Sequence, residues 1–149
     1  MIEGLTEDYI KIIFFARQES HRLGHNFVCT EQILLGTLHG ETGIAAKVLE
    51  LKRVILEQAR VEVEKIIGRG SDVPIHDCYP FTSKAEHAID LAEEEAKRLG
   101  HNYLDTGHLL LGTLRIEDGI AIQVLANLGV DATEICDLVV RMLGENTEV

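Results

Sequence analysis

Apolar residues recur at helical spacing near the start of the chain. Between Thr6 and Gly24, small or apolar side chains are three or four residues apart, at Tyr9, Ile12, Ile13, Ala16, Ser20 and Leu23. The same spacing returns after Thr82, at Ala85, Ala88, Ile89, Ala92, Ala96 and Leu99. Because an α-helix turns once in about 3.6 residues, such positions share one face. The pattern predicts two amphipathic helices, each with a buried stripe.

The two helices belong to a longer internal repeat. When the sequence is aligned with itself at an offset of 76, residues 4–68 pair with residues 80–144 without a gap, and 24 of these 65 pairs are identical. The segment RLGHN occurs at 22–26 and again at 98–102, and Leu-Leu-Gly-Thr-Leu occurs at 34–38 and at 110–114. Gapless identity of this extent indicates a duplicated structural unit.

Capping residues mark where the helices of each unit begin and end. Thr6 and Thr82 stand where an N-cap hydroxyl accepts a free backbone N–H, and Gly24 and Gly100 stand where a C′ residue adopts positive φ. We expect Thr30 and Thr106 to be the N-caps of the second helix of each unit. The third helix should begin near Gly43 and Gly119, and the fourth should end at Gly68 and Gly144. Asp131 and Glu134 have the spacing of a capping box.

These signals predict an all-α fold of about eight helices, arranged as a pseudo-twofold tandem repeat of two stacked four-helix units. Within one domain of residues 1–149, repeat 1 covers about 4–68, a linker with Pro74 and Pro80 covers 69–81, and repeat 2 covers about 82–144. No strand pattern of useful length is present. Where repeat 2 has Gly129 between its third and fourth helices, repeat 1 has Arg53. This difference predicts that the third and fourth helices of repeat 1 form one continuous helix.

Composition narrows the class of protein. A chain of 149 residues, 46% hydrophobic and 26% charged, is typical of one compact soluble domain, with a monomer as the default. The formal net charge of −11 argues against nucleic acid and anionic membranes as partners, because both attract Lys and Arg. Three cysteines without CxxC spacing and the lack of a signal-peptide pattern favour a reducing, cytoplasmic compartment. No apolar run reaches the roughly 18 residues that span a bilayer.

The repeated motif also resembles a known family. The pattern RLGHN-x-x-x-T-x-x-x-LLG-x-L followed by G-I-A occurs twice and is similar to the double Clp-N motif, the N-terminal domain of ClpC-type Clp ATPases. The likeness covers about Leu5 to Gly144, and Ala59–Gly70 is especially similar to ClpC of cyanobacteria and plastids. The resemblance implies a pair of four-helix repeats that binds substrates and adaptor proteins and passes them to an ATPase ring feeding the ClpP protease. For a plant protein it implies the plastid stroma.

The resemblance does not extend to an ATPase. A Walker A loop requires G-x-x-x-x-G-K-[ST], and the chain has no Gly-Lys pair. We therefore expect a non-catalytic module without a cofactor, either a stand-alone protein similar to the ClpT accessory proteins or a domain of a larger ATPase. The expected partners are a Clp ATPase, a ClpP-type core, and adaptor or substrate proteins. The alternatives are a structural subunit that braces a ClpP-type core, and a small metal- or ligand-binding protein.

The resemblance also implies candidate binding residues. Some ClpC N-domains recognise phosphoarginine, once per repeat, with the Thr that begins helix one and the Glu that follows the Thr of helix two. The corresponding pairs are Thr6 with Glu31, and Thr82 with Gly107, which lacks the carboxylate. Amides at a helix start favour a phosphoryl group, and a carboxylate can pair with the guanidinium. We expect binding in repeat 1 only; the alternative is that Thr6 and Glu31 simply stabilise helix starts.

Histidines and cysteines suggest other chemistry only weakly. His21 and His25 have the i, i+4 spacing of a metal pair, but Gly24 is expected to end the helix between them, so no metal site is predicted. We expect His25 and His101, with Asn26 and Asn102, to tie the turn after helix one through hydrogen bonds to backbone. Cysteine–histidine pairs that are close in sequence, such as Cys78 with His76 or Cys29 with His25, do not by themselves establish a catalytic nucleophile and its base. Cys136 aligns with Arg60, so repeat 1 has no thiol at the position of Cys136.

One surface feature predicts contact with another protein. Ile10 and Phe14 lie away from the buried stripe of helix one, where repeat 2 has Glu86 and Asp90. An exposed apolar strip is a candidate docking surface; the alternative is that the N-terminal segment or repeat 2 covers it.

Overall fold

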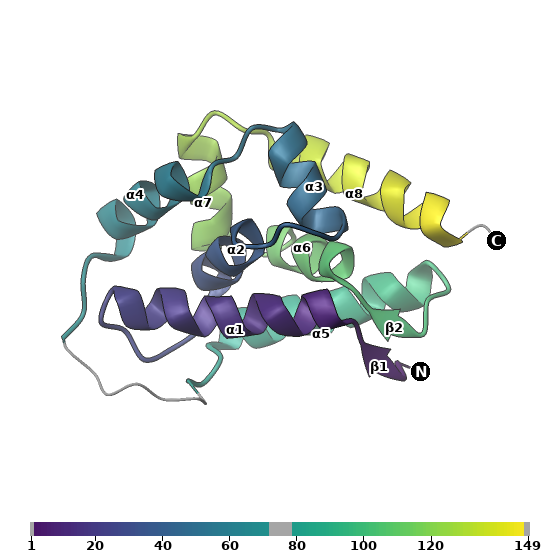
Figure 1. Cartoon of the computed structure of the whole chain (residues 1–149), viewed down its shortest axis with the longest axis horizontal. Helices are drawn as coiled ribbons and strands as arrows, with labels where there is room; N and C mark the ends of the chain where they lie inside the picture. Colours follow the sequence, from purple (N-terminus) through teal and green to yellow (C-terminus); the bar gives the residue numbers. More distant parts are fainter. Residues whose placement is uncertain (1, 72–78, 148–149) are drawn as a thin grey trace.

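The computed structural model describes residues 2–71 and 79–147, and in this part of the chain it contains eight helices and two short strands (Figure 1). In chain order these elements are β1 (Gly4–Leu5), α1 (Glu7–Arg22), α2 (Thr30–Leu38), α3 (Ile44–Leu51), α4 (Leu56–Ile67), α5 (Ser83–Arg98), β2 (Tyr103–Leu104), α6 (Thr106–Leu114), α7 (Ile120–Asn127) and α8 (Ala132–Thr147). The all-α prediction is confirmed. No described helix is both long enough and apolar enough to traverse a bilayer.

The duplication is visible in the helix boundaries. Each helix of repeat 2 begins 76 residues after its counterpart, at the pairs Glu7 and Ser83, Thr30 and Thr106, Ile44 and Ile120, and Leu56 and Ala132. The first helices both have 16 residues, the second 9 and the third 8. The fourth helices differ, because α4 ends before Gly68 as expected whereas α8 continues through Gly144 to Thr147.

The two repeats are interlocked rather than stacked as separate bundles. Helix α3 packs mainly on α6 and α8, and α7 packs mainly on α2 and α4, so each third helix lies against the other repeat. The threonines that open the second helices explain this arrangement. The Thr106 hydroxyl accepts the N–H of Ala45 at 3.2 Å, and the Thr30 hydroxyl accepts the N–H of Ala121 at 3.3 Å. Thr30 and Thr106 thus satisfy the starts of helices in the opposite repeat, and the N-caps of α2 and α6 are Cys29 and Asp105.

The recurring Ala and Leu-Leu-Gly-Thr-Leu residues mark two close helix crossings. A Cβ atom at Gly36 would lie 2.9 Å from the backbone nitrogen of Ala16, and one at Gly112 would lie 2.8 Å from that of Ala92. Helices α1 and α2, and likewise α5 and α6, therefore approach closer than any side chain at the glycine allows. The buried leucines that precede each glycine, Leu34 with Leu35 and Leu110 with Leu111, join one core that extends through both repeats.

Short β pairings connect the repeats at the helix starts, which the sequence pattern did not predict. Strand β1 pairs in parallel with β2 in the register Gly4 to Tyr103, and Val28 forms an isolated parallel bridge with Phe81. Each pairing joins the residues before the first helix of one repeat to those before the second helix of the other. The pairings therefore determine which helix starts become neighbours.

Local backbone geometry confirms some expected boundaries and corrects others. Thr6 and Thr82 cap α1 and α5, and Gly24 and Gly100 both have φ of 77°. Helices α3 and α4 are separate, because Arg53 adopts φ of 59° in the place that Gly129 occupies in repeat 2 with φ of 75°. A non-glycine residue in this region is disfavoured but allowed, so the missing glycine did not fuse the helices.

The capping box at α8 forms only in part. Asp131 accepts the N–H of Thr133 at 2.8 Å, whereas the Glu134 carboxylate lies 3.4 Å from Lys52 Nζ. Most of the proposed linker, including Pro74, His76 and Cys78, lies outside the described residues.

Candidate functional site

Each predicted binding threonine lies next to residues of the opposite repeat. The Thr6 hydroxyl donates to Asp105 Oδ1 at 2.9 Å, and the Thr6 N–H donates to the Leu104 carbonyl at 2.9 Å. The Thr82 N–H donates to the Val28 carbonyl at 2.9 Å, and the Thr82 hydroxyl hydrogen-bonds the Cys29 sulfur. The structure therefore brings Thr82 to the start of α2 beside Glu31, and Thr6 to the start of α6 beside Gly107. The within-repeat pairs Thr6 with Glu31 and Thr82 with Gly107 are not brought together.

Glu31 is a buried carboxylate that is only partly compensated by its surroundings. Its side chain is 1% exposed, and its Oε1 atom is buried without a hydrogen-bond partner. Burial raises the pKa of Glu31, although its own backbone N–H, the Cys29 thiol and the charges of His25 and Lys84 oppose the rise. A buried carboxylate oxygen with no partner is costly unless a donor reaches it. The site is therefore suited to a cationic or hydrogen-bond-donating ligand group.

Lys84 and the backbone N–H groups at the start of α5 place positive charge next to Glu31. Lys84 lies in the first turn of α5, is exposed, and bridges Asp118 Oδ2 at 3.2 Å. The start of a 16-residue helix carries partial positive charge from its free N–H groups. A group that carries both a phosphoryl and a guanidinium therefore finds a complement to each part here.

The equivalent site at Thr6 is more acidic. Asp8 stands where the other site has Lys84, Asp105 replaces Cys29, and Gly107 replaces Glu31. A Cβ atom at Gly107 would lie 3.1 Å from the Leu143 side chain, so α8 fills the space that a longer side chain needs. Two carboxylates and no lysine disfavour an anion at this site. The two sites are related by sequence but differ in what they can bind.

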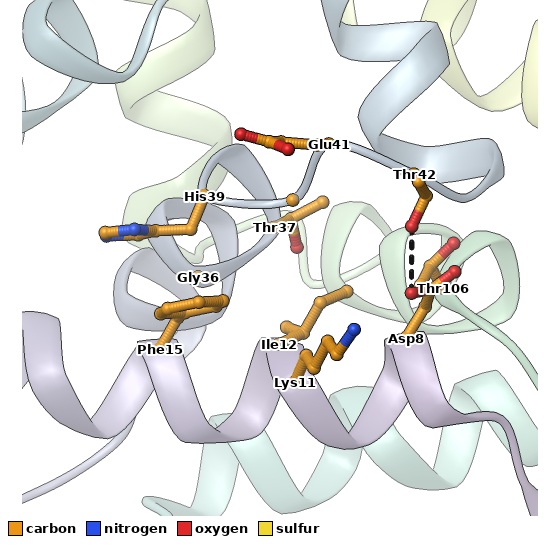
Figure 2. Close-up of a pocket in the computed structure, with 11 residues that line it drawn as sticks. Asp8, Lys11, Ile12, Phe15, Gly36, Thr37, His39, Glu41, Thr42 and Thr106 are labelled. Atoms are coloured by element: carbon orange, nitrogen blue, oxygen red, sulfur yellow. Dashed lines mark hydrogen bonds between the residues drawn. The ribbon is translucent and has the colours of Figure 1, made fainter.

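A cavity of about 320 Å³ adjoins the Thr6 site (Figure 2). Ile12 and Phe15 of α1 form its apolar floor, and the ring of Phe15 stacks on that of His39 with centroids 4.6 Å apart. Figure 2 shows Glu41 across the cavity from α1, and Asp8 with Thr42 at one end, joined by a 3.0 Å hydrogen bond. The cavity combines an apolar floor with carboxylates at its rim.

Sequence reasoning missed a buried ion cluster that occurs in both repeats. Glu19 is 2% exposed, and its carboxylate lies 2.7 Å from Arg60 Nη2, 2.7 Å from His39 Nε2 and 3.1 Å from Arg22 Nε. Burial alone raises the pKa of Glu19, but hydrogen bonds from Arg60 and His39 and the charge of Arg22 outweigh it, so the pKa is lowered. The cluster ties α1 to α2 and α4.

Repeat 2 has the same cluster with different cations. Glu95 lies 2.6 Å from Arg98 Nη2 and 2.6 Å from Arg115 Nη2. Arg115 occupies the position of His39, and Cys136 occupies that of Arg60. The identity of Glu19 and Glu95 in the aligned repeats was the available signal, although burial of a glutamate is not evident from sequence.

His101 and His108 form a buried pair. His108 Nδ1 accepts the N–H of Asp105 at 2.9 Å, so its Nε2 carries the hydrogen and donates to His101 Nδ1 at 2.8 Å. Burial and the neighbouring His101 lower the pKa of His108 to about 4. Asn102, which was expected to bond backbone, donates instead to the Glu3 side chain, at 2.8 Å from Oε2. His25 does bond backbone, 2.9 Å from the Gly68 carbonyl.

The histidine pair predicts a pH-dependent stability. The folded state resists protonation of His108 until pH falls to about 4, whereas the unfolded chain takes up the proton near 6.5. The unfolding free energy should therefore fall by about 3 kcal/mol as pH drops across this window. Urea titrations at intervals from pH 7 to 4 measure it. In His108→Gln, which copies Gln32 of repeat 1, this part of the loss should disappear; an unchanged profile would contradict the assignment.

The thiols and remaining histidines form no metal cluster among the described residues. His21 Nδ1 lies 2.9 Å from the Tyr79 hydroxyl, away from the His25 contact with Gly68. Cys29 and Cys136 are free, and burial raises the pKa of both thiols. Thiolate chemistry is therefore disfavoured at both.

Comparison with known proteins identifies the family. Residues 4–78 and 80–149 each match the Clp repeat (R) N-terminal domain. The chain is 55% identical over 149 residues to chloroplastic chaperone protein ClpC1 of Arabidopsis thaliana, and 55% identical to the chloroplastic ClpA homolog of Brassica napus, named as the ATP-binding subunit of the ATP-dependent Clp protease. All of this chain is covered in both comparisons, but only 16% and 17% of those relatives.

Solved structures share the fold. The ClpD N-terminal domain of Arabidopsis thaliana matches with a TM-score of 0.76 at 23% identity, over 93% of this chain and 94% of that one. The Hsp104 N-terminal domain of Candida albicans matches with a TM-score of 0.72 at 17% identity, over 95% and 93%. The chain therefore belongs to the Clp repeat (R) N-terminal domain family.

Proposed function

We propose that this module receives polypeptides by gripping a phosphorylated arginine between Thr82 and Glu31. The observation that carries the proposal is the buried Oε1 of Glu31, which no protein donor satisfies. A guanidinium supplies N–H donors and positive charge to that oxygen. The phosphoryl group then faces the start of α5 and Lys84, where cationic and N–H groups are concentrated.

The proposal changes which site of the chain is expected to bind. The resemblance to ClpC N-domains implied a site of repeat 1 built on Thr6 and Glu31. The bridge between Val28 and Phe81 and the Thr82–Val28 hydrogen bond support a site that joins Thr82 with Glu31. Asp8 and Asp105 beside Thr6 disfavour an anion there. We therefore expect one phosphoarginine site per chain, formed jointly by the two repeats.

Matched threonine variants test the proposal. Thr82→Ala should weaken the binding of free phosphoarginine by about tenfold or more, because it removes a hydroxyl at the site and loosens the start of α5. Thr6→Ala removes the equivalent N-cap, with a similar stability cost of about 1 kcal/mol, but should leave affinity unchanged. Isothermal calorimetry on both purified variants gives the comparison. Equal losses, or a loss only in Thr6→Ala, would count against the Thr82–Glu31 site.

The partners are part of the same proposal. We propose that polypeptides pass from this module to a Clp ATPase working with a ClpP-type core, in the stroma of a plastid or an equivalent reducing compartment. The names of the chloroplast relatives support this placement. Pull-down assays distinguish it from bracing of the core: retention by the ATPase or by phosphoarginine peptides supports reception, whereas retention by the protease core alone supports bracing.

A further inference from the structure

Exposed apolar residues are distributed unequally between the repeats. Six large apolar side chains are exposed among the described residues, and all six belong to repeat 1. For five of them the aligned residue of repeat 2 is acidic or an amide, in the pairs Ile10 and Glu86, Phe14 and Asp90, Leu51 and Asn127, Ile55 and Asp131, and Val61 and Asp137. The same helix positions are therefore compatible with polar side chains in this fold. The fold does not require the apolar side chains of repeat 1.

Two of these residues form a continuous surface with the cavity of Figure 2. Ile10 and Phe14 are one turn apart on α1 and are 54% and 56% exposed. The Phe14 ring meets the Phe15 ring edge-on at 5.5 Å, and Phe15 belongs to the cavity floor. The side chains of Ile10 and Phe14 are thus open to solvent in the chain as described, neither buried by the N-terminal segment nor by repeat 2. An apolar strip that leads into a cavity provides both area and an anchor point.

The rim of this surface determines the charge of its occupant. Asp8 and Glu41 line the cavity, and Lys11 is the one lysine or arginine among the described residues of its lining, which also includes His39. Figure 2 shows the two carboxylates at separate edges of the cavity. A second copy of the chain would oppose these acids with its own, on a protein of net charge −11, which disfavours self-association. A basic partner gains attraction at the same positions.

We propose that the outer face of α1 and this cavity, together the α1 docking surface of Ile10, Phe14, Phe15, Asp8 and Glu41, bind a partner segment with apolar side chains next to lysine or arginine. One apolar side chain enters the cavity over Ile12 and Phe15, and a neighbouring cation pairs with Asp8 or Glu41. The surface is separate from Thr82 and Glu31, so it serves an adaptor or a second segment of a substrate. It needs no phosphoarginine.

Three unphosphorylated, fluorescently labelled peptides of equal length test the proposal: one with leucine and lysine, one with leucine and glutamate, and one with serine and lysine. We expect anisotropy titrations to show binding of the leucine–lysine peptide alone. Phe14→Asp, which copies repeat 2, should weaken that binding about tenfold or more, because it replaces the central apolar contact with a charge. Asp8→Lys, also copied from repeat 2, should weaken it by removing the charge pairing. Glu86→Gln on α5 is the matched control and should have no effect.

Each other outcome overturns the proposal. Equal affinity for the lysine and glutamate peptides rejects the charge assignment, and unchanged binding by Phe14→Asp rejects the surface. Sedimentation velocity that shows a dimer lost in Phe14→Asp assigns the surface to self-association instead. Calorimetry of Phe14→Asp with phosphoarginine should match the parent protein, so failure at this surface is distinguishable from failure of the Thr82–Glu31 site.

Discussion

Replacing Glu19 with glutamine is expected to lower the unfolding free energy by about 3 to 5 kcal/mol at neutral pH, the usual cost of removing one partner from a buried ion cluster. The carboxylate is 2% exposed and contacts three cationic or basic groups, Arg22 of α1, Arg60 of α4 and His39 at the end of α2. An amide cannot neutralise Arg60 and Arg22, which then remain partly buried without a counter-charge. Urea unfolding followed by far-UV circular dichroism measures the loss.

The controls for Glu19 come from repeat 2. Glu95→Gln should cost a similar amount, because Glu95 is equally buried between two arginines, whereas Glu94→Gln on the exposed face should stay within about 0.5 kcal/mol of the parent. The sign of the pH dependence is also determined. Since the pKa of Glu19 is lowered in the fold, its contribution is complete above the ordinary value of 4.5 and is lost as pH falls through the lowered value. A Glu19→Gln deficit that grew on acidification would contradict this account.

Replacing Glu31 with glutamine is expected to weaken phosphoarginine binding by about 2 kcal/mol or more, or about thirtyfold, because it removes the charge that pairs with the guanidinium. The same change should stabilise the protein at pH 7. Burial raises the pKa of Glu31, so the ionised side chain destabilises the fold once pH exceeds the ordinary value of 4.5. Calorimetry and urea unfolding on one preparation measure both effects.

Opposite changes in affinity and stability are the signature of a binding residue. A residue that only supports the start of α2 would lose stability when replaced. The stability gain of Glu31→Gln should shrink as pH falls toward 4.5, where the parent carboxyl takes up a proton. Glu41→Gln, an exposed glutamate on the loop after α2, is the control and should leave phosphoarginine affinity unchanged. Unchanged affinity in Glu31→Gln would reject the proposed site.

Much of the local structure could be predicted because its causes are local. Thr6 and Thr82 cap their helices through the N–H groups three residues ahead, and Gly24 and Gly100 adopt the positive φ that ends a helix. The self-alignment also predicted that the helices of the two repeats begin at matching positions, 76 residues apart. Where prediction failed locally, as at Arg53, an ordinary residue took a conformation that glycine takes more easily.

The candidate site could be predicted only as a list of residues. The resemblance to ClpC N-domains associates Thr6 with Glu31, both of repeat 1. Their neighbours are decided by the strand pairing of Gly4–Leu5 with Tyr103–Leu104 and by the bridge between Val28 and Phe81. These pairings are only one or two residues long and leave no periodic pattern. The crossing of the repeats therefore could not be inferred.

By itself, the sequence determined the all-α class, the duplication, the helix starts and the apolar character of Ile10 and Phe14, because propensity, capping and helical periodicity act over a few residues. Only the tertiary structure decided that each third helix packs on the opposite repeat, that Glu19 and Glu31 are buried, and that the start of α5 lies beside the start of α2. Burial and charge pairing depend on residues far apart in the chain. The two repeats therefore form sites of different charge, because each site contains residues from both repeats at positions where the repeats differ in sequence.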